Sequence, residues 1–122
     1  MTNYVVLTTF LLYNKYKLKE KVIVNIKEMQ KEIWQNKINK GFNTTDVNKE
    51  FCLLYGEVSE AYETWKKKKD DLGEELADIA IYLMGLSEMF GFDLEDEIIN
   101  KVKKNEKRVY KKIDGVNVRI ND

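Results

Sequence analysis

Two pairs of carboxylate side chains, each pair three residues apart, are the part of this sequence best suited to chemistry. Glu57 and Glu60 form the first pair in "EVSE", and Glu75 and Asp78 form the second in "EELAD". On an α-helix, a spacing of three residues separates two side chains by about 60° around the axis, so each pair lies on one face. Like charges repel, so a cluster of four carboxylates needs a positive charge between them.

The composition restricts which positive charge that can be. The chain of 122 residues has no histidine and a single cysteine, Cys52. Without imidazole or paired thiolates, the four carboxylates make a hard, all-oxygen site, which suits Mg²⁺, with Mn²⁺ as a substitute, better than zinc or copper. Because Mg²⁺ commonly shares its coordination shell with substrate phosphates, the pattern favours a phosphate-bearing substrate.

An exposed acidic face is the other interpretation of each pair, because acidic residues are common there and improve solubility. Both pairs, however, border an apolar stripe. The residues that adjoin them are Leu54, Val58 and Ala61 for the first pair and Leu76, Ile79 and Leu83 for the second. If the two helices pack antiparallel through these stripes, the four carboxylates converge at one edge of the interface. The match in spacing and position favours a binding site.

Four amphipathic helices account for most of the chain, over residues 19–40, 44–67, 71–90 and 93–112. Apolar residues recur at steps of three and four in these ranges, and the chain has no proline to break them. Gly41 and Gly91 are suitable helix stops, and Asp46 and Asp93 are suitable N-caps. The stripe expected on the second helix consists of Val47, Phe51, Leu54, Val58, Ala61 and Trp65.

The predicted fold is therefore all-α, a four-helix bundle. Ile81 and Met84 lie off the main stripe of the third helix, so this helix has more apolar surface than one hairpin partner covers. We expect a homodimer or a homotetramer built from dimers. The predicted divisions are an N-terminal extension over residues 1–20, a helical domain over 21–112 and a tail over 113–122.

The two ends of the chain have weaker patterns. Residues 4–13 are uncharged and largely apolar but too few to span a bilayer, and their β-branched and aromatic content favours a strand that packs on the body or on a partner subunit. The tail has an Asp-Gly turn, Asp114–Gly115, between short alternating runs. This pattern is compatible with a short hairpin or with disorder.

Charge and cysteine content limit the classes of function. The 21 basic and 21 acidic side chains cancel, which argues against a nucleic-acid-binding protein. A single cysteine excludes an internal disulfide and favours a reducing, cytoplasmic setting. Cys52 lies among apolar residues in "EFCLLYG", and we expect it to be a buried structural thiol. No membrane attachment is expected.

The fourth predicted helix adds basic and amide side chains. Lys101, Asn105 and Arg108 fall within about a quarter-turn of one another on a helix and border its apolar stripe. Beside a site of metal and carboxylates they can hold phosphate oxygens. The alternative is that basic residues near a helix C-terminus only interact with the helix dipole.

Taken together, "EVSE", "EELAD" and "KVKKNEKR" resemble the MazG-like nucleoside triphosphate pyrophosphohydrolases, which belong to the all-α NTP pyrophosphatase superfamily. The family motif is E-x-x-E, a gap, and E-x-x-D, and Glu57, Glu60, Glu75 and Asp78 occupy its four places, with fourteen residues between the two pairs. The resemblance covers residues 39–112.

The resemblance implies Mg²⁺-dependent hydrolysis of a nucleoside or deoxynucleoside triphosphate to the monophosphate and pyrophosphate. It implies that the four motif carboxylates bind the metals and are catalytic, and that the downstream residues Lys101, Asn105 and Arg108 contact phosphate or sugar. Trp34 and Trp65 are candidates to stack on the base, although core packing is favoured for both. Relatives pair, with the four-helix core completed across the interface.

Two other functions stay open at this stage. The first is a non-enzymatic helical adaptor or regulator, oligomeric, whose acidic edge binds a basic partner. The second is a pyrophosphohydrolase of the same fold that acts on a phosphoribosyl nucleotide. Divalent-metal binding separates the first from an enzyme, and product analysis over a panel of nucleotides separates the second.

Overall fold

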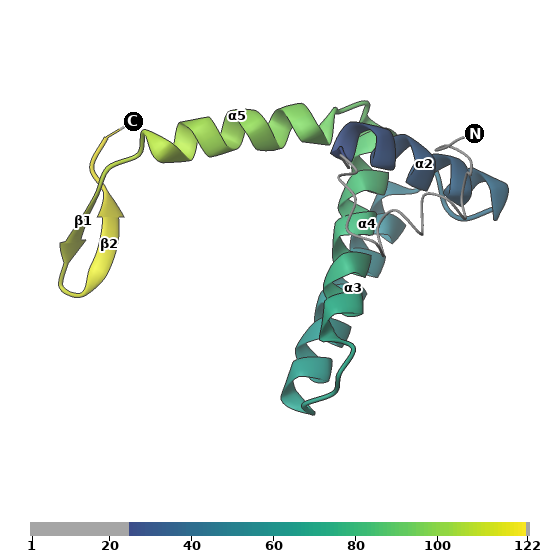
Figure 1. The fold of residues 1–122 in the computed structure, drawn as a ribbon, viewed down its shortest axis with the longest axis horizontal. Coiled ribbons are helices and arrows are strands. Elements are labelled where there is room, and N and C mark those ends of the chain that lie inside the picture. The colour runs from purple at the N-terminus through teal and green to yellow at the C-terminus, as the bar shows by residue number, and fades with distance from the viewer. Residues whose placement is uncertain (1–24, 122) are drawn as a thin grey trace, which may run out of the picture.

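The computed structural model describes residues 25–121, and the expected strand at residues 4–13 lies outside that range. In chain order, with the labels of Figure 1, the elements are α2 (Ile26–Asn39), α3 (Val47–Lys66), α4 (Leu72–Phe90), α5 (Leu94–Glu106), β1 (Tyr110–Ile113) and β2 (Val116–Arg119). The prediction of an all-α fold with four helices is confirmed, and the one sheet in the described range is the two-stranded β1–β2 hairpin.

The helices form a body and an arm. Helices α3 and α4 pack side by side as a helical hairpin, and α2 packs on α4 near the end of that hairpin. Helix α5 touches α2 at its start and then extends away from the body, with the β1–β2 hairpin at its far end (Figure 1). The body therefore carries α3 and α4, on which both acidic pairs lie.

Side-chain caps explain where three of the helices begin. Asn25 Oδ1 accepts a hydrogen bond from the Glu28 amide at 2.7 Å, and Asp46 Oδ1 accepts one from the Lys49 amide at 3.1 Å. Asp93 caps α5 in the same way, as the sequence predicts. These caps satisfy amides that have no partner inside the helix.

The chain turns sharply where α4 ends. Gly91 has a left-handed backbone with φ of 74°, which glycine adopts without a Cβ penalty. The Phe92 amide then donates to the Ser87 carbonyl at 2.8 Å. This turn directs α5 away from α4 and leaves the start of α5 in contact with α2.

Helix α5 is shorter than predicted, and this corrects the helix expected over 93–112. The helix ends at Glu106, and Tyr110–Ile113 is a strand that pairs with Val116–Arg119. Asp114 and Gly115, both with positive φ (51° and 78°), form the two-residue turn that hairpins favour. The aromatic and β-branched residues after the helix suit the hairpin better than another helical turn.

The face of α3 that turns inward differs from the predicted stripe. The residues that are buried or half-buried are Val47, Glu50, Leu54, Glu57, Ala61 and Thr64. Phe51, Val58 and Trp65 of the predicted stripe are exposed, and Cys52, expected to be buried, is exposed as well. A two-helix hairpin covers one side of α3 only, so an apolar stripe remains on its other side.

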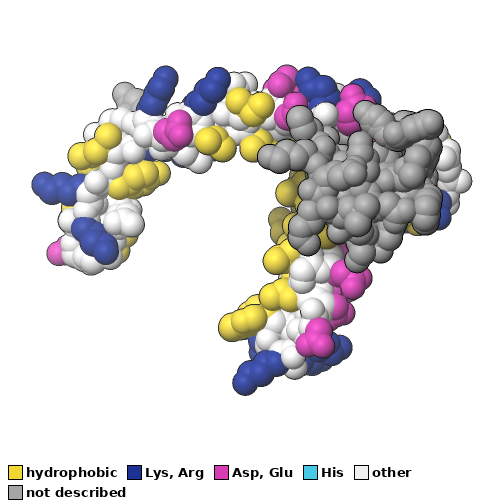
Figure 2. Space-filling model, in the orientation of Figure 1, with side chains coloured by type: hydrophobic (Ala, Val, Ile, Leu, Met, Phe, Trp, Pro, Cys, Tyr) yellow, Lys and Arg dark blue, Asp and Glu magenta, His cyan; other side chains and the backbone are white. Residues whose placement is uncertain are grey.

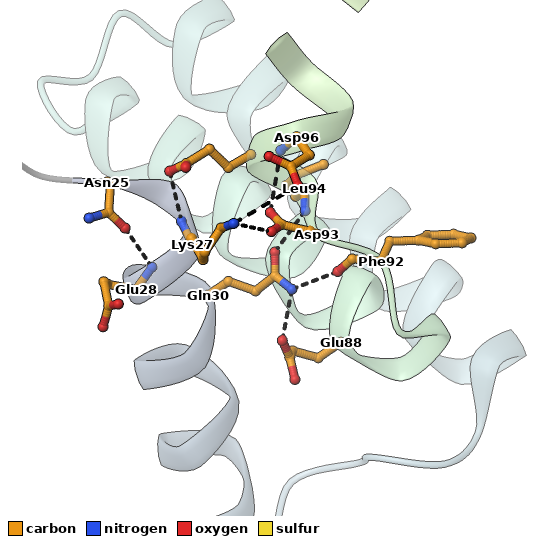
Figure 3. A network of polar contacts seen from close by, with 10 residues as sticks. Asn25, Lys27, Glu28, Gln30, Glu88, Phe92, Asp93, Leu94 and Asp96 are labelled. Carbon is orange, nitrogen blue, oxygen red and sulfur yellow. Dashed lines mark hydrogen bonds and ion pairs between the residues drawn. The ribbon is translucent and has the colours of Figure 1, made fainter. Parts of the chain in front are cut away.

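A buried glutamine joins α2 to the start of α5. Gln30 Nε2 donates to Glu88 Oε2 at 2.8 Å and to the Phe92 carbonyl at 2.9 Å, and Gln30 Oε1 accepts from the Leu94 amide at 3.1 Å (Figure 3). The side chain is almost fully buried. It therefore satisfies two backbone groups of the α4–α5 connection that would otherwise lack partners.

An ion pair reinforces the same connection. Lys27 Nζ lies 2.7 Å from Asp93 Oδ2 (Figure 3). The hydrogen bond from Lys27 lowers the pKa of Asp93 below its usual value, and its contact with Asp93 raises the pKa of Lys27. Because the pair is exposed to solvent, it contributes less than the buried glutamine to holding α5.

We expect Gln30→Met to destabilise the fold by about 2 kcal/mol, because a thioether of similar length leaves the Phe92 carbonyl and the Leu94 amide without partners. The free energy of unfolding in urea, followed by circular dichroism, measures the loss. Gln35→Met on the exposed side of α2 is the matched control and should change stability little. Equal effects of the two substitutions would contradict the role assigned to Gln30.

Candidate metal and nucleotide site

The α3–α4 hairpin brings three of the four motif carboxylates together. Glu57, Glu60 and Glu75 each offer one carboxylate oxygen, and these oxygens all lie within 4.8 Å of one another. Glu57 and Glu75 are half-buried, and Glu60 is exposed. We refer to these three residues as the acidic cluster.

Asp78, the fourth residue of the motif, lies one turn beyond Glu75 on α4 and is half-buried. It is not part of the set that meets within 4.8 Å. Its charge nevertheless contributes to raising the pKa of both Glu57 and Glu75. Asp78 therefore stands at the edge of the acidic cluster, where it also lines a cavity between α2 and α4.

Among residues 25–121, no basic side chain forms an ion pair with a carboxylate of the acidic cluster. The pKa of Glu57 is raised by burial and then by the charges of Glu60, Asp78 and Glu75. The pKa of Glu75 is raised by burial and then by its acidic neighbours, Glu60 first. Within residues 25–121, the basic residues that form ion pairs are Lys27, Lys37 and Lys67, and none of them pairs with a motif carboxylate.

The donor set fits a small divalent cation. Mg²⁺ holds oxygen ligands at about 2.1 Å, so two ligands on opposite sides are about 4.2 Å apart. Three oxygens within 4.8 Å reach such positions through small changes of side-chain rotamer. Because every donor is a carboxylate oxygen, Mg²⁺ or Mn²⁺ suits the site and a thiophilic metal does not.

The predicted phosphate contacts of the fourth helix are not near the acidic cluster of the same chain. Lys101 and Asn105 are exposed on α5, which projects away from the α3–α4 hairpin (Figure 1). Arg108 follows the end of α5, and its Nη1 donates to Asn105 Oδ1 at 2.9 Å. Arg108 Nε is buried without a hydrogen-bond partner in the described part of the chain. A role for these three residues in phosphate binding stays a prediction, and their position on α5 does not place them at the acidic cluster of the same chain.

The structure gives the two tryptophans different environments. Trp34 is half-buried on α2 and is not among the residues that line the cavity beside Asp78. Trp65 is 61 % exposed near the end of α3, and its ring lies 6.0 Å from that of Tyr62. Base stacking by Trp34 stays a prediction.

The sequence interpretation missed a second group of polar residues beside the site. Lys37, Glu50 and Tyr82 line the cavity that Asp78 also lines. The spacing of the first helix could have indicated Lys37. Residues 26, 30, 33 and 37 follow one another at steps of four and three, so they share one face of a helix, and this face turns inward with Gln30 and Lys37 on it. On α3 the sequence predicts that Phe51 faces inward, but the residue that does so is its neighbour Glu50.

Comparison with protein families identifies the relationship. A family model described as MazG-like family matches residues 50–122, which is more than half of the chain. The chain belongs to the MazG-like family, a family generally associated with nucleotide pyrophosphohydrolases. Comparisons with curated proteins and with solved structures give no significant match. In residues 25–121, no helix has the length and apolar character needed to cross a membrane.

We expect Mg²⁺ to raise the melting temperature by about 5 °C at ten times its dissociation constant, because binding only to the folded state adds about 1.4 kcal/mol. Glu57→Gln should abolish this shift, and Glu63→Gln, an exposed carboxylate on the same helix, should keep it. Thermal unfolding with NaCl at equal ionic strength is the reference. An unchanged shift in Glu57→Gln would contradict the metal site.

The raised pKa of Glu57 leads to a prediction for the stability of the metal-free protein. An acid with a raised pKa in the folded state costs stability when it ionises, so Glu57→Gln should be more stable than the wild type at neutral pH. This difference should shrink as the pH falls through the folded-state pKa of Glu57. Urea unfolding in EDTA over a pH series measures it. A variant less stable than the wild type throughout would contradict repulsion in the acidic cluster.

Proposed function

We propose that the protein hydrolyses a nucleoside or deoxynucleoside triphosphate to the monophosphate and pyrophosphate in a reaction that depends on Mg²⁺, with Mn²⁺ as a substitute. The observation that carries this proposal is the convergence of Glu57, Glu60 and Glu75 at places of the family motif, with no ion pair to a basic residue in the range 25–121. An uncompensated acidic cluster favours a cation, and a cation coordinated by carboxylates favours a phosphate-bearing ligand.

In this proposal the motif carboxylates of α3 and α4 hold the cation and orient the triphosphate. A bound divalent cation would neutralise phosphate charge and lower the pKa of the attacking water. Glu60, the exposed member of the acidic cluster, faces solvent, from which substrate and water enter. The raised pKa of Glu57 and Glu75 makes these carboxylates better proton acceptors than ordinary ones.

Lysines of the α3–α4 turn are further candidates for phosphate contact. Lys67 and Lys69 line a depression of about 240 Å³ that Glu60 and Glu75 also line. Both belong to a run of four lysines, residues 66–69, which by sequence alone suggests a solvated turn. Its position beside the acidic cluster supports a role in attracting the outer phosphates of the substrate.

We expect Asp78→Asn and Glu57→Gln to lower kcat/KM by about 100-fold or more, since each removes a negative charge that holds the catalytic cation. Glu63→Gln is the control and should retain activity. The assay follows pyrophosphate and nucleoside monophosphate over a panel of triphosphates that includes a phosphoribosyl nucleotide. Release of orthophosphate from the triphosphates, or full activity of Asp78→Asn, would overturn the assignment.

The exposed apolar surface supports a homo-oligomer. On α3 an apolar stripe with steps of four and three faces away from the inward side, with exposures of 42–73 %, and consists of Phe51, Tyr55, Val58, Tyr62 and Trp65. Such spacing is typical of a helix that packs on another helix. Figure 2 shows hydrophobic side chains along the α3–α4 hairpin and along the side of α5 that faces it.

The β1–β2 hairpin adds to this surface. Its register places a set of exposed apolar residues on one face of the ribbon, namely Val109, Ile113, Val116, Val118 and Ile120. The opposite face carries Tyr110, Lys112, Asn117 and Arg119. A two-stranded ribbon alone is marginally stable, so its apolar face favours a partner. A second copy satisfies this need and brings its own Lys101, Asn105 and Arg108 to the assembly.

We expect Val58→Glu combined with Tyr62→Glu to dissociate the assembly and to lower activity at micromolar concentration, because charges at the centre of an apolar interface are costly to desolvate. Asn48→Glu, exposed in the first turn of α3, is the control. Light scattering measures the mass. A wild-type mass near 14.5 kDa with full activity would refute the oligomer.

A further inference from the structure

Charge is distributed unevenly along the chain, although its total is zero. Residues 70–97 contain ten acidic side chains and no basic one, whereas residues 101–119 contain eight basic and two acidic side chains. The acidic range covers α4 and the start of α5, and the basic range covers the rest of α5 and the β1–β2 hairpin. The overall balance of charge, which argues against a nucleic-acid-binding protein, therefore does not describe the arm.

Three lysines gather on one side of α5. At about 100° of rotation per residue, Lys103, Lys104 and Lys107 fall within an arc of about 100°. By the same rotation this arc lies opposite the apolar stripe that contains Ile98 and Val102. All three lysines are exposed, and in the part of the chain that the structure describes none of them forms an ion pair. Figure 2 shows Lys and Arg side chains along the outer side of the arm and hydrophobic ones on the side toward the α3–α4 hairpin.

The β1–β2 hairpin adds an aromatic ring with cations beside it. One face of the ribbon carries Tyr110, Lys112, Asn117 and Arg119, all exposed. Tyr110 pairs across the ribbon with Arg119 and lies two residues from Lys112 on the same strand, so both cations are neighbours of its ring. Tyr110 is 52 % exposed. An exposed ring between two cations offers a stacking surface next to two phosphate contacts.

The α5 lysines lie apart from the surface proposed for assembly. In that proposal the apolar side of α5 faces a second copy, and Lys101, Asn105 and Arg108 border this side. Lys103 and Lys107 lie on the other side of the helix, so an assembly through the apolar stripe leaves them exposed. Exposed cations that no acidic residue pairs with attract a polyanion.

We propose that the arm binds single-stranded nucleic acid. The cations contact the phosphates, and the tyrosine stacks on an unpaired base. We call this surface the basic side of the arm, and it consists of Lys103, Lys104, Lys107, Tyr110, Lys112 and Arg119. The inference goes beyond the proposed hydrolysis and does not depend on it.

The composition of this surface favours a single strand over the other polyanions. Stacking on Tyr110 needs a base whose face is free, and the bases of a duplex are stacked on one another. A membrane surface fits less well. A helix that inserts its apolar stripe into lipid turns the opposite side to water, and that is the side on which the α5 lysines lie.

The test measures binding of the whole chain to oligonucleotides by fluorescence anisotropy. In the test variant all three α5 lysines are replaced, as Lys103→Gln, Lys104→Gln and Lys107→Gln. The matched control removes the same charge from exposed positions on the body, as Lys31→Gln, Lys40→Gln and Lys49→Gln. The probes are oligo(dT) and oligo(U) with 5′-hydroxyl ends in EDTA, so neither a metal nor a triphosphate contributes to binding.

We expect the wild type to bind the probes with an affinity that falls as salt rises. Each phosphate contact with a single strand contributes about 0.7 to the slope of log K against log salt, so the test variant should lose about 2 from this slope. Its affinity at low salt should fall about tenfold or more. The control variant should keep the slope of the wild type.

Tyr110→Thr tests stacking separately from charge. Threonine suits a β-strand, so the hairpin should persist. The affinity for oligo(dT) and oligo(U) should fall about tenfold with an unchanged salt slope, because a stacking partner is lost and no charge is removed. The affinity for a duplex of the same length should not change.

The outcomes separate this inference from the proposed function. Weaker binding by the test variant but not by the control supports the basic side of the arm, whether or not triphosphates are hydrolysed, and the tighter of the two probes identifies DNA or RNA as the ligand. Equal losses in the two variants, or a wild type that binds neither probe, overturn the inference.

A test variant with unchanged affinity for both oligonucleotides also overturns it. In that case a lower mass in light scattering assigns the α5 lysines to contacts with a second copy. Lost binding to vesicles of phosphatidylserine and phosphatidylcholine assigns them to a membrane surface instead.

Discussion

The ion pair between Lys37 and Glu50 is the interaction on which the arrangement of α2, α3 and α4 depends. Glu50 is almost completely removed from water, and Lys37 and Asn43 donate hydrogen bonds to its two carboxylate oxygens. The contact joins α2 to α3 directly, and it lies against Gly85 of α4. Loss of one partner would leave an uncompensated charge in the interior, which costs several kcal/mol.

Two carboxylates on the inward face of α3 have opposite electrostatic environments. Glu50 and Glu57 both occupy inward positions, two turns apart. Glu50 has a lysine partner, whereas burial and then the charges of acidic neighbours raise the pKa of Glu57, which weakens the fold at neutral pH. Unpaired charge of this kind is typical of binding and catalytic sites. The acidic cluster is thus held by a framework whose own charges are balanced.

Helix α5 and the β1–β2 hairpin have little contact with the body. Gln30 and the Lys27–Asp93 pair fix the start of α5 (Figure 3). Beyond that point the helix and the β1–β2 hairpin expose apolar residues (Figure 2). An apolar face on an arm that leaves the body favours burial against another molecule. This geometry and the exposed stripe of α3 both support the proposal that a second copy of the chain completes the bundle.

The sequence by itself determined the all-α class, the helix stops at Gly41 and Gly91, the caps at Asp46 and Asp93, and the pairing of acidic residues on consecutive helices, because these depend on local spacing and backbone preference. Tertiary structure alone decided which face of α3 turns inward. Hydrophobicity favours Phe51, Val58 and Trp65, yet Glu50 and Glu57 lie inside, since a lysine thirteen residues away neutralises Glu50 and packing on α4 covers Glu57. The end of α5 was likewise predicted too far along the chain, at residue 112 instead of Glu106. Pairing across the Asp114–Gly115 turn competes with the helix only once both strands are formed. Local patterns contain no information about such distant partners, and these partners position the acidic cluster and the cavity beside it.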